Sequence, residues 1–279
     1  MSLLRRIYYT LGPLQRRWVR RLFFLPSDIF DAVLKRRAPL VPPKGMIFTG
    51  QGDFAATGDT LLKNLVDTCA LKPDHHILDV GCGIGRLARP LTAFLNEDGT
   101  YEGFDVVEDG IKWCRKNYHA YPNFNFSFTP LKNDLYNLNT KQTADTFQFP
   151  YPDQFFDLVV LTSVFTHMQM EEVRNYFLEI GRVLKPGGHC FATFFIINKE
   201  TETYLDKSRN PFFPYRFRHY FLHDPRVRDA NIAYRHEIIV GMATAAELSV
   251  DQFYPGWWAG KSQNACMNFQ DVLVLKTLT

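Results

Sequence analysis

The chain of 279 residues has 46% hydrophobic and 22% charged residues, the composition of a globular protein with a sizeable core. It has no run of about 18 apolar residues, so no membrane-spanning helix is predicted. Its five scattered cysteines lack a zinc-binding spacing and are typical of a reducing compartment; with no signal-peptide pattern at the start, we expect a cytoplasmic protein.

The net charge of +3 is unevenly distributed, because residues 1–37 hold nine basic and two acidic residues and carry +7, which leaves −4 for the rest. Apolar residues recur there at spacings of three or four with arginines between them, which predicts an amphipathic helical arm interrupted at Pro13. Three interpretations are open: an arm packed on the core, an anchor on an anionic membrane surface that would make the protein membrane-associated, or an RNA-binding segment.

The prolines of residues 38–45 predict an extended linker, after which strands and helices alternate. Continuous apolar strands that alternate with helices predict an α/β fold with a parallel sheet covered on both faces. We therefore expect an arm and linker over 1–44 and a domain over 45–279, with an insertion at about 199–231. The expected strands are 76–80, 99–105, 124–129, 156–162, 190–197 and 270–276, and the expected helices are 59–70, 86–95, 110–118, 171–184 and 235–248.

Three glycines at alternate positions, Gly81, Gly83 and Gly85, follow the expected strand 76–80 and lead into a helix. The dinucleotide-binding fingerprint would need its third glycine at position 86, which is Arg86 here. Asp79 lies two residues before the first glycine, where its carboxylate would repel a pyrophosphate and attract an ammonium group. The ligand is therefore expected to carry a positive group near this turn.

Asp105 ends the next expected strand, 20 positions after Gly85. A carboxylate at that place can accept hydrogen bonds from both hydroxyls of a ribose. Together with Asp79, this predicts a nucleoside that bears an amino acid without a phosphate bridge. S-adenosylmethionine (SAM) fits that description.

The segments "ILDVGCGIGRLA", "YEGFDVV" and "FDLVVLTSVFTHM…EIGRVLKPGGHCFATFF" together resemble the class I SAM-dependent methyltransferases, over about residues 49–197 with a tail at "FQDVLVLK". The resemblance implies a Rossmann-like, doubly wound sheet of seven strands with the last strand antiparallel. SAM would lie over the carboxyl ends of the strands.

The resemblance also implies roles for individual residues. The loop from Gly81 through Cys82 and Gly83 to Gly85 would let the backbone approach the methionine part, and Asp79 would orient its amino group. The remaining expected cofactor contacts are Asp105 to the ribose, Val106, Asp134 and Leu135 around the adenine, and Thr162 near the transferred methyl group. Asp134 is open to a second interpretation as a solvated surface acid.

The segment 162–168 follows the fourth expected strand, where the methyl group should meet its acceptor. Relatives that methylate bases or exocyclic amines commonly carry Asn/Asp-Pro-Pro-Tyr/Phe there, and "TSVFTH" disfavours that chemistry. His167 is the candidate catalytic base, since a neutral imidazole can take a proton from an attacking hydroxyl. The alternative is a histidine that only makes hydrogen bonds within the fold.

Two segments are candidates for the acceptor pocket. Residues 46–58, which include Phe48, have bends that suggest a loop over the cofactor, and "FYPGWWAGKSQ" supplies Trp257 and Trp258. Aromatic residues suit a sugar or ring acceptor, but they also build ordinary cores.

These observations favour a SAM-dependent methyltransferase that methylates an oxygen of a small molecule, a glycan or a lipid-linked acceptor, with no metal ion. The alternatives are an RNA methyltransferase, which the sequence disfavours, and a SAM-binding interaction module without catalysis. The sequence does not predict the oligomeric state.

Overall fold

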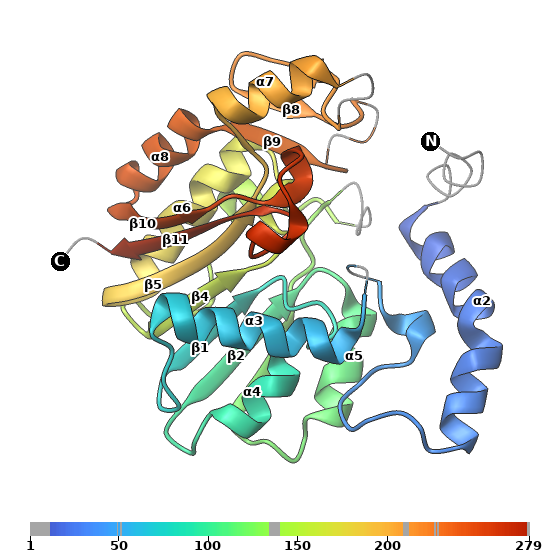
Figure 1. Ribbon diagram of the computed structural model, residues 1–279. Helices are drawn as coiled ribbons and strands as arrows, with labels where there is room; N and C mark the ends of the chain where they lie inside the picture. Colours follow the sequence, from blue (N-terminus) through green and yellow to red (C-terminus); the bar gives the residue numbers. More distant parts are fainter. Residues whose placement is uncertain are drawn as a thin grey trace.

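The computed structural model describes residues 12–48, 50, 52–133, 140–208, 212–225, 227 and 229–277. Within these ranges a central sheet has seven strands in the order β10-β11-β5-β4-β1-β2-β3, and β11 runs antiparallel to both of its neighbours (Figure 1). The predicted doubly wound sheet with an antiparallel last strand is therefore confirmed. The strands are β1 (His76–Val80), β2 (Thr100–Asp105), β3 (Phe124–Phe128), β4 (Phe156–Leu161), β5 (Leu184–Phe194), β10 (Leu248–Tyr254) and β11 (Asp271–Thr277).

Alternating side chains of the strands build two separate cores, one on each face of the sheet. Leu78 and Val159 belong to one core, whereas their neighbours Ile77 and Val160 belong to the other. Helices α6 (Met170–Val183) and α8 (His236–Ala245) cover the first face. Helices α3 (Phe54–Cys69), α4 (Ala88–Phe94) and α5 (Glu108–Asn117) cover the second.

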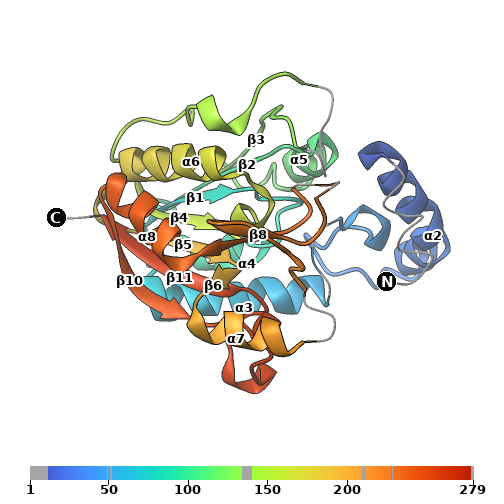
Figure 2. The same ribbon diagram turned by 90° about the horizontal axis from the view of Figure 1, so that it is seen from above.

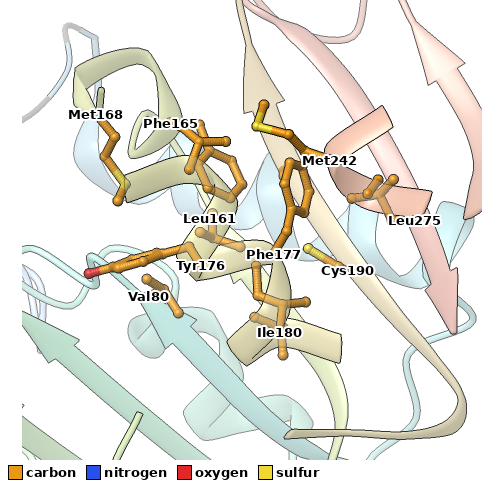
Figure 3. Packing of buried hydrophobic residues seen from close by; sticks show 14 of the residues in the cluster. Val80, Leu161, Phe165, Met168, Tyr176, Phe177, Ile180, Cys190, Met242 and Leu275 are labelled. Carbon is orange, nitrogen blue, oxygen red and sulfur yellow. The ribbon is translucent and has the colours of Figure 1, made fainter. Parts of the chain in front are cut away.

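Figure 3 shows the first core, where aromatic rings fill the space between the sheet and α6. Phe165 stacks on Phe194 with ring centroids 4.8 Å apart, and Phe177 lies beside both rings. The chain has 25 phenylalanine residues, and packing alone explains part of that number.

Several elements differ from the predicted boundaries; helix α3, expected over 59–70, already begins at Phe54. The strand expected at 190–197 begins at Leu184, because the chain continues directly from α6 through the Lys-Pro-Gly-Gly segment, and Gly187 takes a φ of +77° in it. The helix expected over 235–248 ends at Ala245, and Glu247 turns the chain with a φ of +59° into β10, a strand that the sequence analysis missed.

The insertion expected at 199–231 contributes two of the four strands of a second, smaller sheet of order β6-β9-β8-β7. Its elements are β6 (Ile196–Ile197), α7 (Lys199–Lys207), β7 (Tyr215–Arg216), β8 (Tyr220–Leu222) and β9 (Ile232–Arg235). A separate aromatic core of Phe195, Phe213, Phe221 and Trp258 supports it. This unit stands above the carboxyl ends of the central strands in Figure 1.

The predicted helical arm is present as α2 (Pro13–Val33), which lies beside the domain and outside its layers (Figure 2). Arg17 and Arg21 of α2 pair with Asp109 of α5, at 3.7 and 3.3 Å. Asp28 of α2 accepts hydrogen bonds from the backbone N–H groups of Lys44 and Gly45 in the short helix η1 (Lys44–Met46). Polar contacts therefore hold the arm beside the domain, and the three interpretations of its role stay open.

Across the described residues, no helix is long and apolar enough to cross a bilayer.

Candidate active site

The glycine loop between β1 and α4 has three positions whose backbone conformation favours glycine. Gly81, Gly83 and Gly85 have φ values of +74°, +60° and +78°, which side chains rarely allow. A Cβ atom on Gly81 would lie 2.5 Å from a methyl carbon of Val164, and one on Gly85 would lie 3.1 Å from the sulfur of Cys114. The loop is thus pressed between the turn after β4 and helix α5.

The carboxylate of Asp105 closes this loop at the tip of β2. Its two oxygens accept hydrogen bonds from the backbone N–H of Gly83 at 2.8 Å and of Val107 at 2.7 Å. Burial raises the pKa of Asp105 to about 6, although these N–H donors oppose the rise. Each oxygen has a second lone pair, so the group can also accept from ribose hydroxyls.

Asp79 lies on the neighbouring strand and is almost completely buried. Its Oδ2 accepts a hydrogen bond from the hydroxyl of Tyr101 at 2.7 Å. Burial raises the pKa of Asp79 to about 7, and the negative charge of nearby Asp105 adds to the rise. Two buried carboxylates with few cations around them form a site that favours a cationic ligand.

Phe48 belongs to the loop that the sequence analysis expected to cover the cofactor. A Cβ atom on Gly110 of α5 would lie 3.2 Å from the ring of Phe48 and 2.5 Å from the carbonyl oxygen of Gly83. The ring therefore lies next to the glycine loop, at the start of α5. Asp53 ends this covering loop by accepting from the N–H of Ala56 at the start of α3.

The turn after β4 contains Ser163, and this residue and its partner Gln270 were not singled out by the sequence analysis. Ser163, next to the half-buried Thr162, has a φ of +59°, which is unusual outside glycine and typical of strained functional turns. Its N–H donates to the hydroxyl of Thr193 at 2.7 Å, and its hydroxyl donates to Gln270 at 2.9 Å. Ser163 and Gln270 lie 107 positions apart, so no local pattern could have paired them.

His167 ends the short helix η3 (Phe165–His167) after that turn. Its Nδ1 donates to the carbonyl oxygen of Asp229 at 2.7 Å, so this nitrogen carries the proton. Burial lowers the pKa of His167, which keeps the ring neutral at pH 7. Two further hydrogen bonds join this segment to the region of the second sheet. The side chain of Gln169 donates to the carboxylate of Asp229, and the hydroxyl of Tyr234 donates to the carbonyl oxygen of Met168.

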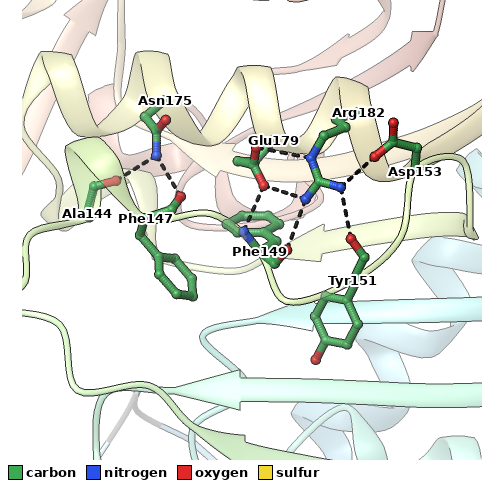
Figure 4. A network of polar contacts seen from close by, with 8 residues as sticks. All are labelled: Ala144, Phe147, Phe149, Tyr151, Asp153, Asn175, Glu179 and Arg182. Atoms are coloured by element: carbon green, nitrogen blue, oxygen red, sulfur yellow. Dashed lines mark hydrogen bonds and ion pairs between the residues drawn. The ribbon is translucent and has the colours of Figure 1, made fainter.

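The expected adenine contacts Asp134 and Leu135 lie outside the described residues. The segment that follows them is fastened to α6 by a polar network (Figure 4). Arg182 donates to the carbonyl oxygens of Phe149 and Tyr151 at 2.9 and 2.8 Å, and Asn175 donates to those of Ala144 and Phe147. Val106, the remaining adenine candidate, packs partly buried against the first core.

Trp258 is a correction to the predicted acceptor pocket. Its ring is buried among Phe195 and Phe213, and its indole N–H donates to Asp271 at 2.7 Å. Because the ring is buried in the core of the second sheet, it is not exposed to an acceptor. Trp257 is half-buried and makes an edge contact with Phe269.

In the described part of the chain, no group of three His, Cys, Asp or Glu side chains is placed to hold a metal ion.

The arrangement of the sheet and the glycine loop is that of a class I SAM-dependent methyltransferase, and comparison with known proteins agrees. Residues 78–192 match the family model described as a methyltransferase domain. Among solved structures, a SAM-dependent methyltransferase from Clostridium acetobutylicum superposes with a TM-score of 0.53 at 14% identity, over 92% of this chain and 100% of that one. A protein of Pyrococcus horikoshii gives 0.56 at 17% identity, over 84% and 95%.

Residues 78–192 therefore match a methyltransferase domain, and this match together with the fold implies SAM as the cofactor. The glycine loop, whose three glycines lie between two buried acids, fits that cofactor.

Curated relatives match over smaller parts. The demethylmenaquinone methyltransferase of Symbiobacterium thermophilum is 33% identical over 42% of this chain and 41% of its own length. The cyclopropane-fatty-acyl-phospholipid synthase of Escherichia coli is 25% identical over 71% and 46%. The chain thus matches less than half of the length of these relatives. A fatty-acid O-methyltransferase of Mycolicibacterium smegmatis and a tRNA N(3)-cytidine methyltransferase of Danio rerio match as well, at 31% and 26% identity, over 42% and 41% of this chain and 36% and 30% of their own lengths.

Proposed function

We propose that this protein transfers the methyl group of SAM to an oxygen atom of a lipid-linked or similarly apolar acceptor. The observation that carries the proposal is the contact between the glycine loop and the turn after β4. Val164 of that turn packs against Gly81 so closely that a Cβ there would clash, and Thr162 and Ser163 precede it. An acceptor bound over this turn would lie beside the methionine end of the cofactor.

The residues of the loop have positioning roles in this proposal. Asp79 holds the amino group, Asp105 holds the ribose, and the backbone of Gly81 to Gly85 approaches the ligand between them. SAM supplies an already activated methyl group on its sulfonium, so the protein mainly has to align the acceptor oxygen and exclude water. The hydroxyl-rich turn with Thr162 and Ser163 suits a hydroxyl or carboxyl acceptor.

The apolar nature of the acceptor is supported by two observations. Several matched relatives are named for fatty-acyl, phospholipid or quinone-type compounds, although one is named for tRNA. The arm next to the site exposes a row of large apolar side chains. The second observation favours an apolar acceptor over RNA, because RNA binding depends mainly on contacts of basic side chains with phosphates.

Transfer of label from tritiated SAM to a fractionated cell extract tests the proposal. We expect label in the organic-solvent fraction, on an oxygen atom located by mass spectrometry. Asp105→Ala should abolish the transfer, and the exposed Asp145→Ala serves as the matched control that retains it. Label confined to RNA would contradict the proposed acceptor, and SAM binding without any labelled product would contradict catalysis.

His167 enters the proposal as the base, acting through Nε2 because Nδ1 already donates to Asp229. A base contributes about 100-fold or more, so His167→Gln should lower kcat by that factor while the Kd for SAM is unchanged. Because burial lowers the pKa of His167 below 6.5, the wild-type rate should rise with pH and be level by pH 7. An unchanged kcat together with a lower Tm would assign His167 to structure instead.

A further inference from the structure

Helix α2 turns polar side chains toward the domain and large apolar side chains toward solvent, which is the reverse of the usual arrangement. In a surface helix of a globular protein the apolar stripe faces the core and the charged residues face water. Here the side chains toward the domain are polar: Arg16 is buried, Arg17 pairs with Asp109, and Asp28 binds η1. The large apolar residues of the helix point outward.

The exposed apolar residues form a continuous outer face. Phe23 is 76% exposed, Val33 73% and Trp18 62%. A contiguous group of such residues differs from the single hydrophobic residues that are scattered over ordinary protein surfaces. The outer face consists of Leu14, Trp18, Val19, Leu22, Phe23, Leu25, Ile29, Phe30 and Val33.

Basic residues follow the C-terminal end of this outer face, and the two acids of the arm already have partners in the protein. Residues 12–37 hold seven basic and two acidic residues. Both acids lie on the inner face, where Asp28 binds the backbone of η1 and Asp31 pairs with Lys44 at 2.9 Å. The guanidinium of Arg36 lies over the exposed ring of Phe30, 5.2 Å from its centroid. Arg16 is buried, Arg17 and Arg21 pair with Asp109, and Arg37 pairs with Asp28 at 3.8 Å. The positive charge that the arm presents to a partner therefore comes from Arg20, Lys35 and Arg36.

We propose that the outer face of α2 inserts into the surface of an anionic lipid bilayer. Apolar and aromatic side chains enter the boundary between head groups and acyl chains, and the flanking arginines reach the lipid phosphates. The 21 residues of the helix are about 32 Å long, and a helix this basic lies in the plane of the interface. A bilayer fits better than a second protein copy because Lys35 and Arg36 at the end of the apolar face would repel the same residues of the copy and attract lipid phosphates.

The position of the arm connects this surface to the active site. The chain runs from α2 through residues 34–47 into Phe48. The ring of Phe48 lies beside Gly110 of α5, which in turn contacts Gly83 of the glycine loop. Arg17 is close enough to Asp105 for its charge to lower the pKa of that carboxyl. A membrane bound at α2 therefore lies on the same side of the domain as the cofactor site.

Sedimentation of the full-length protein with vesicles tests the inference. We expect it to pellet with vesicles of phosphatidylglycerol and phosphatidylcholine, and at least tenfold more weakly with phosphatidylcholine alone. The double variant Leu22→Glu/Phe23→Glu should lose at least tenfold of its binding. Leu178→Glu, at an exposed apolar position on α6, is the matched control and should bind as the wild type does.

Calorimetry with SAM on the same samples shows that each variant is folded, since Leu22 and Phe23 lie outside the cofactor site. If the wild-type protein stays in the supernatant with anionic vesicles, the inference is wrong. In that case light scattering tests for a dimer. A wild-type dimer that the double variant Leu22→Glu/Phe23→Glu dissociates would show that a second copy covers the outer face. Neither result affects the methyl-transfer assay, so this inference can fail while the proposed function stands.

Discussion

Asp79 is a buried carboxyl whose pKa of about 7 makes its charge depend on pH near neutrality. The raised pKa means that the folded apo-protein binds a proton that the unfolded chain, with a pKa near 3.8, releases. This contribution to stability is present below about pH 4 and is lost as the pH rises through 7. A bound ammonium group reverses the preference, because it stabilises the ionised carboxylate.

We therefore predict that the affinity for SAM increases as the pH rises from 5.5 to 8, with proton release from Asp79 below pH 7. Asp79→Asn should weaken binding by about tenfold or more at pH 8 and flatten the pH profile. Titration calorimetry in two buffers of different ionisation enthalpy measures both effects. An affinity of the wild-type protein that is independent of pH would show that Asp79 does not contact the amino group.

The sequence could predict Asp79 and Asp105 because both belong to short motifs in which chain order fixes the position in space. A residue at the tip of a parallel strand lies at the ligand-binding edge of the sheet wherever the sheet forms. Ser163 and Gln270 could not be found in this way, since their contact depends on how β11 inserts beside β5. The bond of His167 to Asp229 depends likewise on the fold of a distant insertion.

At the scale of elements, Asp271 joins the central sheet to the second one. It begins β11 and accepts three hydrogen bonds, from the N–H groups of Ile196 and Gly256 and from the indole of Trp258, each at 2.7 Å. Burial raises the pKa of Asp271 to about 6, so at pH 7 the ionised carboxylate can serve all three donors. An amide has an oxygen on one side only and would leave at least one donor facing an NH₂ group.

We predict that Asp271→Asn lowers the free energy of unfolding by about 2 kcal/mol, the cost of a buried unpaired donor, and the Tm by about 6 °C. Asp145→Asn, at an exposed position, should change the Tm by less than about 1 °C. Scanning calorimetry at pH 7 checks both variants. Equal melting temperatures for all three proteins would mean that the junction at Asp271 does not stabilise the fold.

The second sheet shows why short elements resist prediction from sequence. Strands of two to four residues, such as β7 and β8, have too few positions for an alternating pattern to be recognised. Their aromatic core also includes Trp258, which lies far along the chain. Because these core partners could not be seen in the sequence, Trp258 was expected in a pocket. The long apolar strands β1, β4 and β11 needed no such information.

At the scale of the whole molecule, few buried apolar contacts join the arm to the domain. Among the described side chains of α2, the buried one is Arg16, and the buried hydrophobic residues begin at Phe54. The ion pairs of Arg17 and Arg21 with Asp109 are partly exposed, and pairs of this kind contribute at most about 1 kcal/mol. This supports the predicted boundary near residue 44, which stays a prediction.

Deletion of residues 1–37 should therefore leave the domain folded, with a Tm within about 4 °C of the full-length value, because little apolar surface is lost from the core. Phe48 and the glycine loop are retained, so the affinity for SAM at pH 8 should change less than threefold. At pH 6 it should fall further, since loss of Arg17 raises the pKa of Asp105 and leaves more of that carboxyl protonated. Thermal unfolding and calorimetry at the two pH values measure these effects, and a Tm lower by more than about 10 °C would make the arm an integral part of the domain.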